Sequence, residues 1–312
     1  MPRELILISI HEKSYDGKLA QLTEDEIKHR EKLKGIVKIL AEDIGERNVV
    51  FFKNFHHAAD FIETSFKDLG FKPKRQPFNA LGLTCYNIEI EILGKKNKDE
   101  ILIIGAHYDS ALNSPGANDN ATGVAALLHL ARMFAKKEPS QTVRFVAFAN
   151  EEAPFFRTPQ MGSAVYAKRC KDHKENIIGM LCLETIGYFS DEEGSQRYPF
   201  PIGFLYPSIG NFIGFVSNIS SRSLLKKAIA LFRKHSHYPS QAGAFPGFVP
   251  GIGWSDQWAF WQQGYQAIMI TDTAPFRYPY YHTVQDTVDK IHYEHLTRVV
   301  MGLEKALTEF LN

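Results

Sequence analysis

The sequence predicts an α/β fold, a three-layer sandwich in which helices cover both faces of a mostly parallel, twisted central sheet. Short runs of Val, Ile, Leu and Phe alternate with amphipathic helical segments along the chain. Strands that are apolar throughout are typical of parallel sheets buried on both faces. The chain has 312 residues, of which 44% are hydrophobic, and this is enough to bury one large core. Because the sequence has neither an internal repeat nor a linker between folded halves, we expect residues 1–312 to form a single domain.

The N-terminal segment, about residues 20–70, is predicted to be helical. Over residues 23–45, apolar side chains recur at the spacing of one helix face, and Gly45 ends the pattern. A second helical stretch covers residues 57–69 and ends at Gly70. We therefore expect two helices before the first strand.

Strands and helices alternate from residue 86 onward, which is the order of elements in a parallel sheet. The predicted strands cover residues 86–93, 101–109, 142–150, 177–184 and 267–272. The predicted helices cover residues 124–135, 162–170 and 221–234, with a last helix from about residue 291. The charged tract GKKNKDE between the first two strands is interpreted as a hairpin loop.

Two segments, residues 186–210 and 235–254, interrupt this alternation. Both are rich in Gly, Pro, Tyr and Phe and are too long to be simple connections in a compact domain. Ligands of α/β sheets bind outside the carboxyl ends of the strands, so we expect these loop insertions to wall a pocket there. The candidates for an apolar pocket wall are Phe155, Phe156, Tyr188, Tyr206, Phe245, Phe248, Trp254, Tyr280 and Tyr281.

Composition restricts the partners and the compartment. Thirty-six Lys and Arg balance thirty-five Asp and Glu, so no overall field attracts nucleic acid or an anionic membrane, and neither is expected as a partner. No stretch reaches the ~18 apolar residues of a membrane helix, and the N-terminus lacks the features of a signal peptide. As the sequence stands we expect a cytoplasmic protein, or a periplasmic or secreted one if a signal peptide has been removed. The three cysteines are expected to be buried free thiols.

Acidic and imidazole side chains stand at the ends of several predicted strands or in the loops that follow them. These residues are His107, Asp119, Glu151, Glu152, Glu184 and His282. The carboxyl ends of parallel strands meet at one edge of a sheet, while only Arg144, Arg157 and Arg277 offer positive charge nearby in the sequence. Imidazole and carboxylate donors without thiolate suit zinc or a similar divalent ion. The pattern therefore predicts a metal site.

Five motifs, HYDS, GANDNATG, NEE, LETIGY and YYHT, occur in this order along the chain. In order and spacing they resemble the co-catalytic zinc aminopeptidase family, which also contains glutaminyl cyclases and carboxypeptidase-like members. The similarity covers nearly the whole chain, from about Leu33 to the C-terminus. It implies a zinc-exopeptidase fold of the phosphorylase/hydrolase-like type, a peptide substrate and two zinc ions per chain, with one as the alternative.

Carried over to this sequence, the resemblance implies that Asp119 bridges the two zinc ions. His107 and Glu184 would complete one site, and Glu152 and His282 the other. Most relatives carry Asp where this chain has Glu184, and the longer side chain puts the occupancy of that site in doubt. The peptide bond after the bridging aspartate is commonly cis in the family, which here is the bond from Asp119 to the next residue.

The resemblance also gives Glu151 a role, because it stands beside a ligand without being one. Two divalent ions can hold a hydroxide and polarise a substrate carbonyl at the same time. Glu151 would then be the general acid/base that accepts the proton of the water and passes it to the leaving amine.

Two further acidic residues are candidates for supporting roles. Asp109, two residues after His107, could accept the imidazole N–H that does not bind metal, or it could simply begin a turn. Asp256, in GWSDQWAFW, resembles part of a Ser-Asp-His block of the family, although Gln257 stands where histidine is frequent. It could contact a metal ligand or the substrate amine, or cap a surface helix.

Substrate contacts are expected from the segment DTAPFRYPYYHT. Arg277 could stabilise an oxyanion or bind a substrate carbonyl, and the alternative is a salt bridge to Asp272. Tyr281, next to the candidate ligand His282, is a second candidate for a substrate contact.

Three functions are compatible with these residues. The first is an aminopeptidase that removes N-terminal residues, mainly apolar ones, with two zinc ions. The second is glutaminyl cyclisation with one zinc ion held by Asp119, Glu152 and His282. The third is a non-catalytic binding domain. The intact HYDS motif and the Glu184 oxygen favour the first, and the oligomeric state is not predicted.

Overall fold

The computed structural model describes residues 12–312, and its centre is one mixed sheet. Within that range the sheet has eight strands in the order β1-β2-β4-β3-β5-β8-β6-β7. They are β1 (Lys74–Ala80), β2 (Leu83–Ile92), β3 (Asn97–His107), β4 (Gln141–Phe148), β5 (Asn176–Glu184), β6 (Ile213–Asn218), β7 (Ser240–Phe245) and β8 (Ala267–Thr271). The centre β4-β3-β5-β8 is parallel, as is the pair β6-β7. The pairs β1-β2, β2-β4 and β6-β8 are antiparallel.

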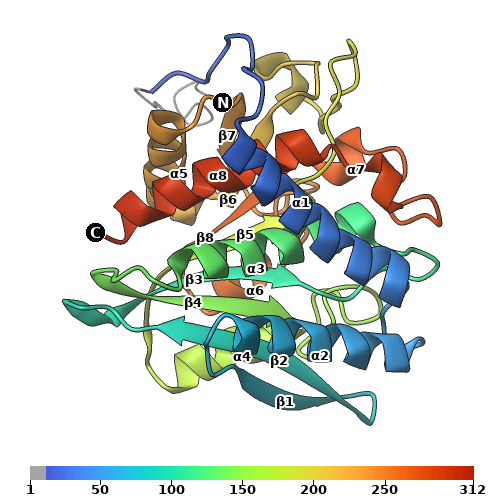
Figure 1. Ribbon diagram of the computed structural model, residues 1–312, viewed down its shortest axis with the longest axis vertical. Coiled ribbons are helices and arrows are strands. Elements are labelled where there is room, and N and C mark those ends of the chain that lie inside the picture. The colour runs from blue at the N-terminus through green and yellow to red at the C-terminus, as the bar shows by residue number, and fades with distance from the viewer. Residues whose placement is uncertain (1–11) are drawn as a thin grey trace.

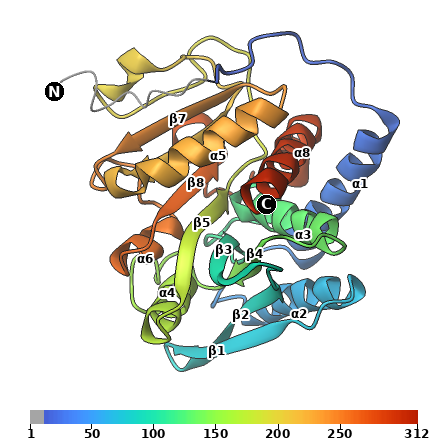
Figure 2. The same cartoon turned by 90° about the vertical axis from the view of Figure 1, so that its left-hand side faces the viewer.

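Helices cover both faces of the sheet, so the predicted three-layer α/β sandwich is confirmed (Figures 1 and 2). One face packs against α1 (Glu24–Lys38), α2 (Phe52–Asp68), α3 (Gly123–Phe134), α5 (Arg222–His235) and α8 (Tyr293–Phe310). The other face packs against α4 (Gly162–Asp172) and α6 (Gln257–Gln262). The short α7 (Ala274–Arg277) follows β8.

The predicted helical N-terminal segment is present. Thr23 caps α1 in a capping box with Glu26, and a π-helical turn, Ile39–Ile44, continues it to Gly45. Gly45 ends the helix with a φ of 76°, a conformation that favours glycine. The second helix begins at Phe52, five residues before the predicted start.

Three parts of the sequence-based topology are wrong. The tract GKKNKDE is not a hairpin loop, because β2 and β3 lie on opposite sides of β4 and do not pair with each other. The sequence analysis missed β1 because its sequence KRQPFNA is largely polar, which is common in edge strands. The sequence analysis also missed β6 and β7, and β7 lies inside the predicted loop insertion 235–254. Its sequence SQAGAF lacks the β-branched residues that mark strands.

Two expectations from composition can be compared with the structure. The three cysteines are buried and free, as predicted. Among residues 12–312, the helices are too short or too polar to span a bilayer.

A pair of histidines, of which His129 is buried, joins α1 to α3. His129 Nε2 lies 2.8 Å from His29 Nδ1, and the His129 ring is fully inside the protein. Burial, followed by the charge of His29, lowers the pKa of His129 to about 3. Since the unfolded-state pKa is ~6.5, the unfolded chain binds the extra proton between these two values. The stability that neutral His129 contributes is therefore fully present above ~pH 6.5 and is lost as the pH falls. Between pH 6 and pH 4 the free energy of unfolding should decrease by roughly 2.5 kcal/mol from this source.

We expect His129→Leu to lose this part of the acid sensitivity. Urea unfolding at about pH 4 and about pH 6 should show a fall in the free energy of unfolding that is roughly 2 kcal/mol smaller for the variant than for the wild type. His173→Leu, at an exposed position, serves as the control and should follow the wild type. An equal fall for His129→Leu and the wild type would contradict the assignment.

Candidate metal centre

The candidate metal centre lies at the carboxyl edge of three neighbouring parallel strands. His107 is the last residue of β3, and Glu184 is the last residue of β5. Glu151 and Glu152 follow shortly after the end of β4. Because β3 pairs in parallel with both β4 and β5, all three strands end at the same edge of the sheet.

Two connections bring the remaining donors to this edge. Asp119 is buried in the turn Ala117–Thr122 between β3 and α3. The peptide bond Asp119–Asn120 is cis, as predicted. His282 lies in the loop after α7 and leaves 40% of its side chain exposed, so the cluster is accessible from that side.

Asp119 joins two groups of donors. Its Oδ1 lies 3.2 Å from His107 Nε2, which is also 3.2 Å from Glu184 Oε2. Its Oδ2 lies 3.0 Å from His282 Nε2, which is 3.3 Å from Glu152 Oε1. In each group the three donor atoms lie within 4.8 Å of one another. The five residues predicted as ligands thus form two sets that share one carboxylate.

These donors fit a bound divalent cation. Within residues 12–312, the buried atoms His107 Nε2, Asp119 Oδ1 and Glu152 Oε1 form no hydrogen bond. Burying polar atoms without a partner is costly unless something else binds them. Imidazole nitrogen and carboxylate oxygen, without thiolate, are donors that zinc accepts.

Charge in the cluster shifts the pKa values of its members. Burial and the charge of Asp119 raise the pKa of Glu152 to about 7. Burial, together with the charges of Glu152 and Glu184, raises the pKa of Glu151 well above its usual range. Burial lowers the pKa of His282, but the carboxylates of Asp119 and Glu152, 3.0 Å and 3.3 Å from its Nε2, outweigh burial and raise the pKa to about 10. The carboxylates therefore stabilise positive charge at this edge, which favours the binding of a cation.

Asp109 connects the donors of β3 with the glutamate pair. Its Oδ1 lies 3.4 Å from His107 Nδ1, the ring nitrogen that faces away from Asp119. The same carboxylate accepts the backbone N–H groups of Glu151 at 3.1 Å and of Glu152 at 3.0 Å. Asp109 therefore lies beside the imidazole and holds the turn after β4, while its role as acceptor of the imidazole N–H stays a prediction.

Asp286 is a supporting residue that the sequence analysis missed. Its two carboxylate oxygens accept the backbone N–H groups of Asn118, at 2.8 Å, and of Asp119, at 3.1 Å. Tyr278 donates its hydroxyl to the same carboxylate. Asp286 lies four residues after His282, so it ties the loop of one candidate ligand to the turn of another. The only signal in the sequence was an acidic residue close to a candidate histidine ligand.

The region around Glu184 contains two further groups from the GWSDQWAFW segment. Ser255 donates its hydroxyl to Glu184 Oε2. Asp256 is fully buried, and burial raises the pKa of its carboxyl to about 7. Although it occupies the N-cap position of α6, its side chain does not cap the helix, so the alternative of a surface helix cap is wrong.

The comparison with models of protein families supports what the geometry suggests. Residues 87–306, more than two thirds of the chain, match the model of Peptidase family M28. The chain belongs to peptidase family M28. This is a family of zinc metallopeptidases, so zinc is the metal implied for the M28 donor cluster described above.

Relatives of this M28 chain include proteins of bacteria and fungi. A protein of Escherichia coli (strain K12), "Uncharacterized protein YfbL", is 37% identical over 282 residues, which cover 88% of this chain and 86% of that protein. A "Probable zinc metalloprotease" of Pyricularia oryzae is 33% identical over 118 residues, 35% of this chain and 22% of that protein.

Solved structures share the fold of this M28 chain. BSAP, a zinc aminopeptidase from Bacillus subtilis, has a TM-score of 0.73 at 15% identity, with 91% of this chain and 95% of that chain covered. The glutaminyl cyclase of Bacteroides thetaiotaomicron has a TM-score of 0.68 at 16% identity, with 89% and 97% covered. This fold is therefore shared with a zinc aminopeptidase and with a glutaminyl cyclase.

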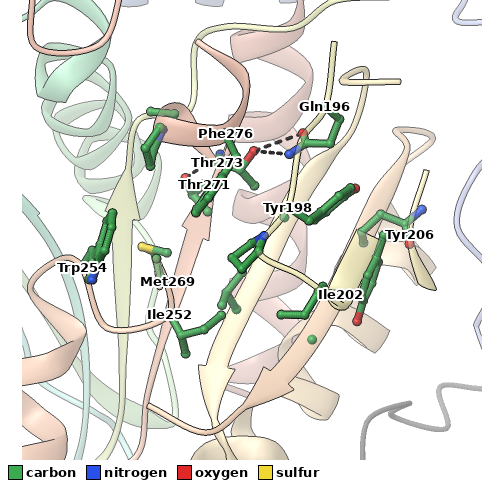
Figure 3. A pocket seen from close by; sticks show the side chains of 18 of the residues that line it. Gln196, Tyr198, Ile202, Tyr206, Ile252, Trp254, Met269, Thr271, Thr273 and Phe276 are labelled. Carbon is green, nitrogen blue, oxygen red and sulfur yellow. Dashed lines mark hydrogen bonds between the residues drawn. The ribbon is translucent and has the colours of Figure 1, made fainter. Parts of the chain in front are cut away.

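An apolar pocket adjoins the cluster of this M28 chain. Glu184 and Tyr281 line one part of it, and Tyr281 stacks on His282 with ring centroids 3.8 Å apart. The rest of its wall combines the 196–206 and 250–254 segments with β6, β7 and β8. Figure 3 shows the labelled wall residues, which include Tyr198, Ile202, Tyr206, Ile252, Trp254 and Met269.

Four of the nine predicted wall aromatics line this pocket, namely Tyr206, Phe245, Trp254 and Tyr281. The other five do not line the pocket. Phe155 is buried in the core, Tyr188 packs against Tyr278, and Phe248 is 86% exposed. Aromatic content alone does not reveal which way a side chain faces, so it could not separate the wall residues from these five.

The structure gives Arg277 a different environment from either predicted one. Its guanidinium donates to Gln196 Oε1 at 2.7 Å and to the carbonyl oxygen of Phe212 at 2.8 Å. It therefore fastens the 186–210 insertion beside β6. Neither a contact to the pocket nor an ion pair with Asp272 is found for Arg277 among residues 12–312.

The sequence analysis considered only Arg144, Arg157 and Arg277 as positive charges near the carboxylates, and the structure corrects this expectation. Arg144 forms ion pairs with Glu91 and Glu175, away from the cluster. Arg157 donates to the carbonyl oxygen of residue 253. Arg47, which the sequence analysis did not consider, is fully buried close to the cluster.

Proposed function

We propose that the chain is a zinc-dependent aminopeptidase whose single catalytic domain removes N-terminal residues from peptides. The observation that carries the proposal is that Asp119 is shared by two donor groups, one of which contains Glu184, a residue in the wall of an apolar pocket. In this proposal His107, Asp119 and Glu184 hold one zinc ion, and Asp119, Glu152 and His282 hold the second. Zinc bound there would act as a Lewis acid on the scissile carbonyl and make the attacking water more acidic.

The residues of the chain divide the remaining tasks. Glu151, outside both donor groups, accepts the proton of the attacking water and returns it to the leaving amine. The carboxylate of Asp109 accepts the backbone N–H of Glu151, so this hydrogen bond fixes the turn that carries the general base Glu151. Tyr281, stacked on His282 at the pocket, is placed to contact the substrate carbonyl.

The pocket and the acidic cluster together favour a free N-terminus with an apolar side chain. The wall residues Ile202, Ile252 and Met269 are apolar, and the charged residues in the lining are Glu184 of the donor cluster and the exposed Arg197. The carboxyl groups of Glu151, Glu184 and Asp256, which are buried at the same edge, would offer oxygen atoms to a positively charged α-amino group. An internal stretch of a protein lacks this amino group, which restricts the proposed reaction to peptide ends.

Glutaminyl cyclisation is the second candidate. It is favoured by one specific observation, that Asp119, Glu152 and His282 already form a complete three-residue donor group. This reaction needs only one zinc ion and no water as nucleophile. The second donor group, with His107 and Glu184, would then have no use, and this is why we place hydrolysis first.

A combined assay decides between these proposals. The zinc content of the purified chain is measured by elemental analysis, and aminoacyl chromogenic substrates and an N-terminal glutaminyl peptide are tested with and without chelator. We expect two equivalents of zinc and chelator-sensitive release of apolar residues. One equivalent together with cyclisation would overturn the aminopeptidase proposal, and a chain with neither metal nor activity would favour a binding domain.

The pocket predicts a change of substrate preference on substitution of Ile202. An aspartate at this position places a negative charge in the wall, so Ile202→Asp should raise the ratio of kcat/KM for lysyl over leucyl substrates by at least about tenfold. Phe204→Asp is the matched control, because Phe204 lies on the same short 3₁₀ helix, is 83% exposed and does not line the pocket. The same ratio in both variants would show that the pocket does not receive the substrate side chain.

A further inference from the structure

Arg47 lies in the link between the π-helical turn Ile39–Ile44 and α2, and it is fully buried. Its guanidinium donates to main-chain oxygens of a loop in a distant part of the sequence. Nε reaches Tyr108 O at 2.7 Å, Nη1 reaches Pro115 O at 2.6 Å, and Nη2 reaches Gly116 O at 2.8 Å. Arg47 therefore holds both ends of the loop 108–116 with one side chain.

The backbone of the link is joined to the same loop. The N–H of Arg47 donates to Ser110 Oγ at 3.1 Å, and the N–H of Ser110 donates to Arg47 O at 3.0 Å. Asn48 adds a hydrogen bond from its side-chain amide to Ser110 O at 3.1 Å. The link and the loop are thus connected by bonds at the start, the middle and the end of the loop.

This loop sets the relative position of three groups of the candidate metal centre. It begins directly after His107, contains Asp109 and leads into the turn that carries Asp119. At its end Gly116 has a φ of 64°, and a Cβ there would lie 2.5 Å from Asp119 O and 3.1 Å from Arg47 Nη2. Because the loop is packed this closely around the guanidinium, a movement of Arg47 would move the donors with it.

The charge of Arg47 is also well placed. Burial lowers the pKa of its guanidinium. The nearby carboxylates of Asp286, Asp109 and Asp119 act in the opposite direction and raise it. With a pKa of about 10 it stays positive at neutral pH. Within the described part of the chain, the hydrogen bonds of its guanidinium nevertheless go to main-chain oxygens, so it leaves the carboxylate oxygens available.

We propose that Arg47 is a positioning residue of the candidate metal centre, which keeps His107, Asp109 and Asp119 in the arrangement for metal binding before a cation arrives. Arg47 lies outside residues 87–306, the part of the chain that matches the family model, so the N-terminal helical segment contributes to the centre through it. The proposal rests on the metal centre of the proposed function, although not on the reaction itself.

The test measures zinc affinity in the absence of substrate, by competition with a chromogenic chelator, for the wild type, Arg47→Met and Arg144→Met. Arg144 is the matched control, because it is a buried arginine of β4 whose ion partners, Glu91 and Glu175, lie away from the cluster. We expect both variants to melt at a lower temperature, but only Arg47→Met to bind zinc more weakly, by about tenfold or more. Wild-type zinc affinity in folded Arg47→Met would overturn the proposal.

Two milder variants keep the test decisive if Arg47→Met does not fold. Arg47→Lys keeps the charge but cannot reach all the acceptor oxygens, and Ser110→Ala removes one of the bonds between the link and the loop. Each should weaken zinc binding by a smaller factor than Arg47→Met, and unchanged affinity in both would count against a positioning role.

Activity assays separate this proposal from the proposed function. In the Arg47 variants, the zinc concentration for half-maximal activity should rise, while KM for the aminoacyl substrate should stay within about twofold of the wild type at saturating zinc. A wild-type chain that binds zinc but cleaves no aminoacyl substrate would overturn the aminopeptidase proposal and leave the affinity test of Arg47 valid.

Discussion

Glu151→Gln is expected to lower kcat by roughly 10³-fold while the chain keeps its full zinc content. The amide has the size and shape of the carboxylate, so the turn that Asp109 holds should be preserved. What is lost is the basic oxygen that takes the proton of the attacking water. Glu151 belongs to neither donor group, so the metal should be unaffected.

The adjacent residue is the control for this prediction. Glu152 has nearly the same burial and lies in the donor group with Asp119 and His282. Glu152→Gln should therefore lose zinc as well as activity, and added zinc should restore part of the activity. If Glu151→Gln loses metal in proportion to activity, Glu151 is a ligand and the proposed division of roles is wrong.

Asp119→Ala should have the largest effect on metal content, because its two oxygens face different donor groups. Oδ1 is next to His107, and Oδ2 is next to His282. Removing the carboxylate takes one donor from each group, so both zinc equivalents should fall and activity should drop by at least roughly 10²-fold. Elemental analysis after dialysis against metal-free buffer measures this directly.

A variant that affects only one of the two donor groups provides the comparison. His282→Ala removes a donor from one group only, and it should lower the zinc content by about one equivalent. If Asp119→Ala also loses a single equivalent, the aspartate does not bridge and the two-zinc arrangement must be abandoned. Circular dichroism of both variants ensures that the loss does not come from unfolding.

The residues of the candidate site were predictable because they stand at the ends of apolar strands. His107, Glu151, Glu152 and Glu184 are each next to a continuous apolar run, and parallel strands must bring such ends to one edge. Asp119 was a candidate because it follows the His107 strand, but its bridging role could be predicted only through the resemblance to a family, since a loop position has no periodicity.

The supporting residues were less accessible to prediction. Asp286 and Arg47 look like ordinary surface residues in the sequence, because a charged side chain is normally exposed. Their roles depend on partners 168 and 61 residues away, Asn118 and Tyr108. Arg277 was assigned to the substrate because of its proximity to His282 in sequence, whereas packing turns it toward Phe212.

The sequence by itself determined the α/β architecture, the two N-terminal helices and the candidate donor residues at the strand ends, since hydrophobic periodicity and the order of elements can be read along the chain. Only the tertiary structure decided that β2 and β3 flank β4, that β7 forms within an insertion, and that Arg47 is buried behind the cluster. These features follow from pairing and burial between distant segments, and the free energy of such contacts is not encoded in any short stretch of the chain.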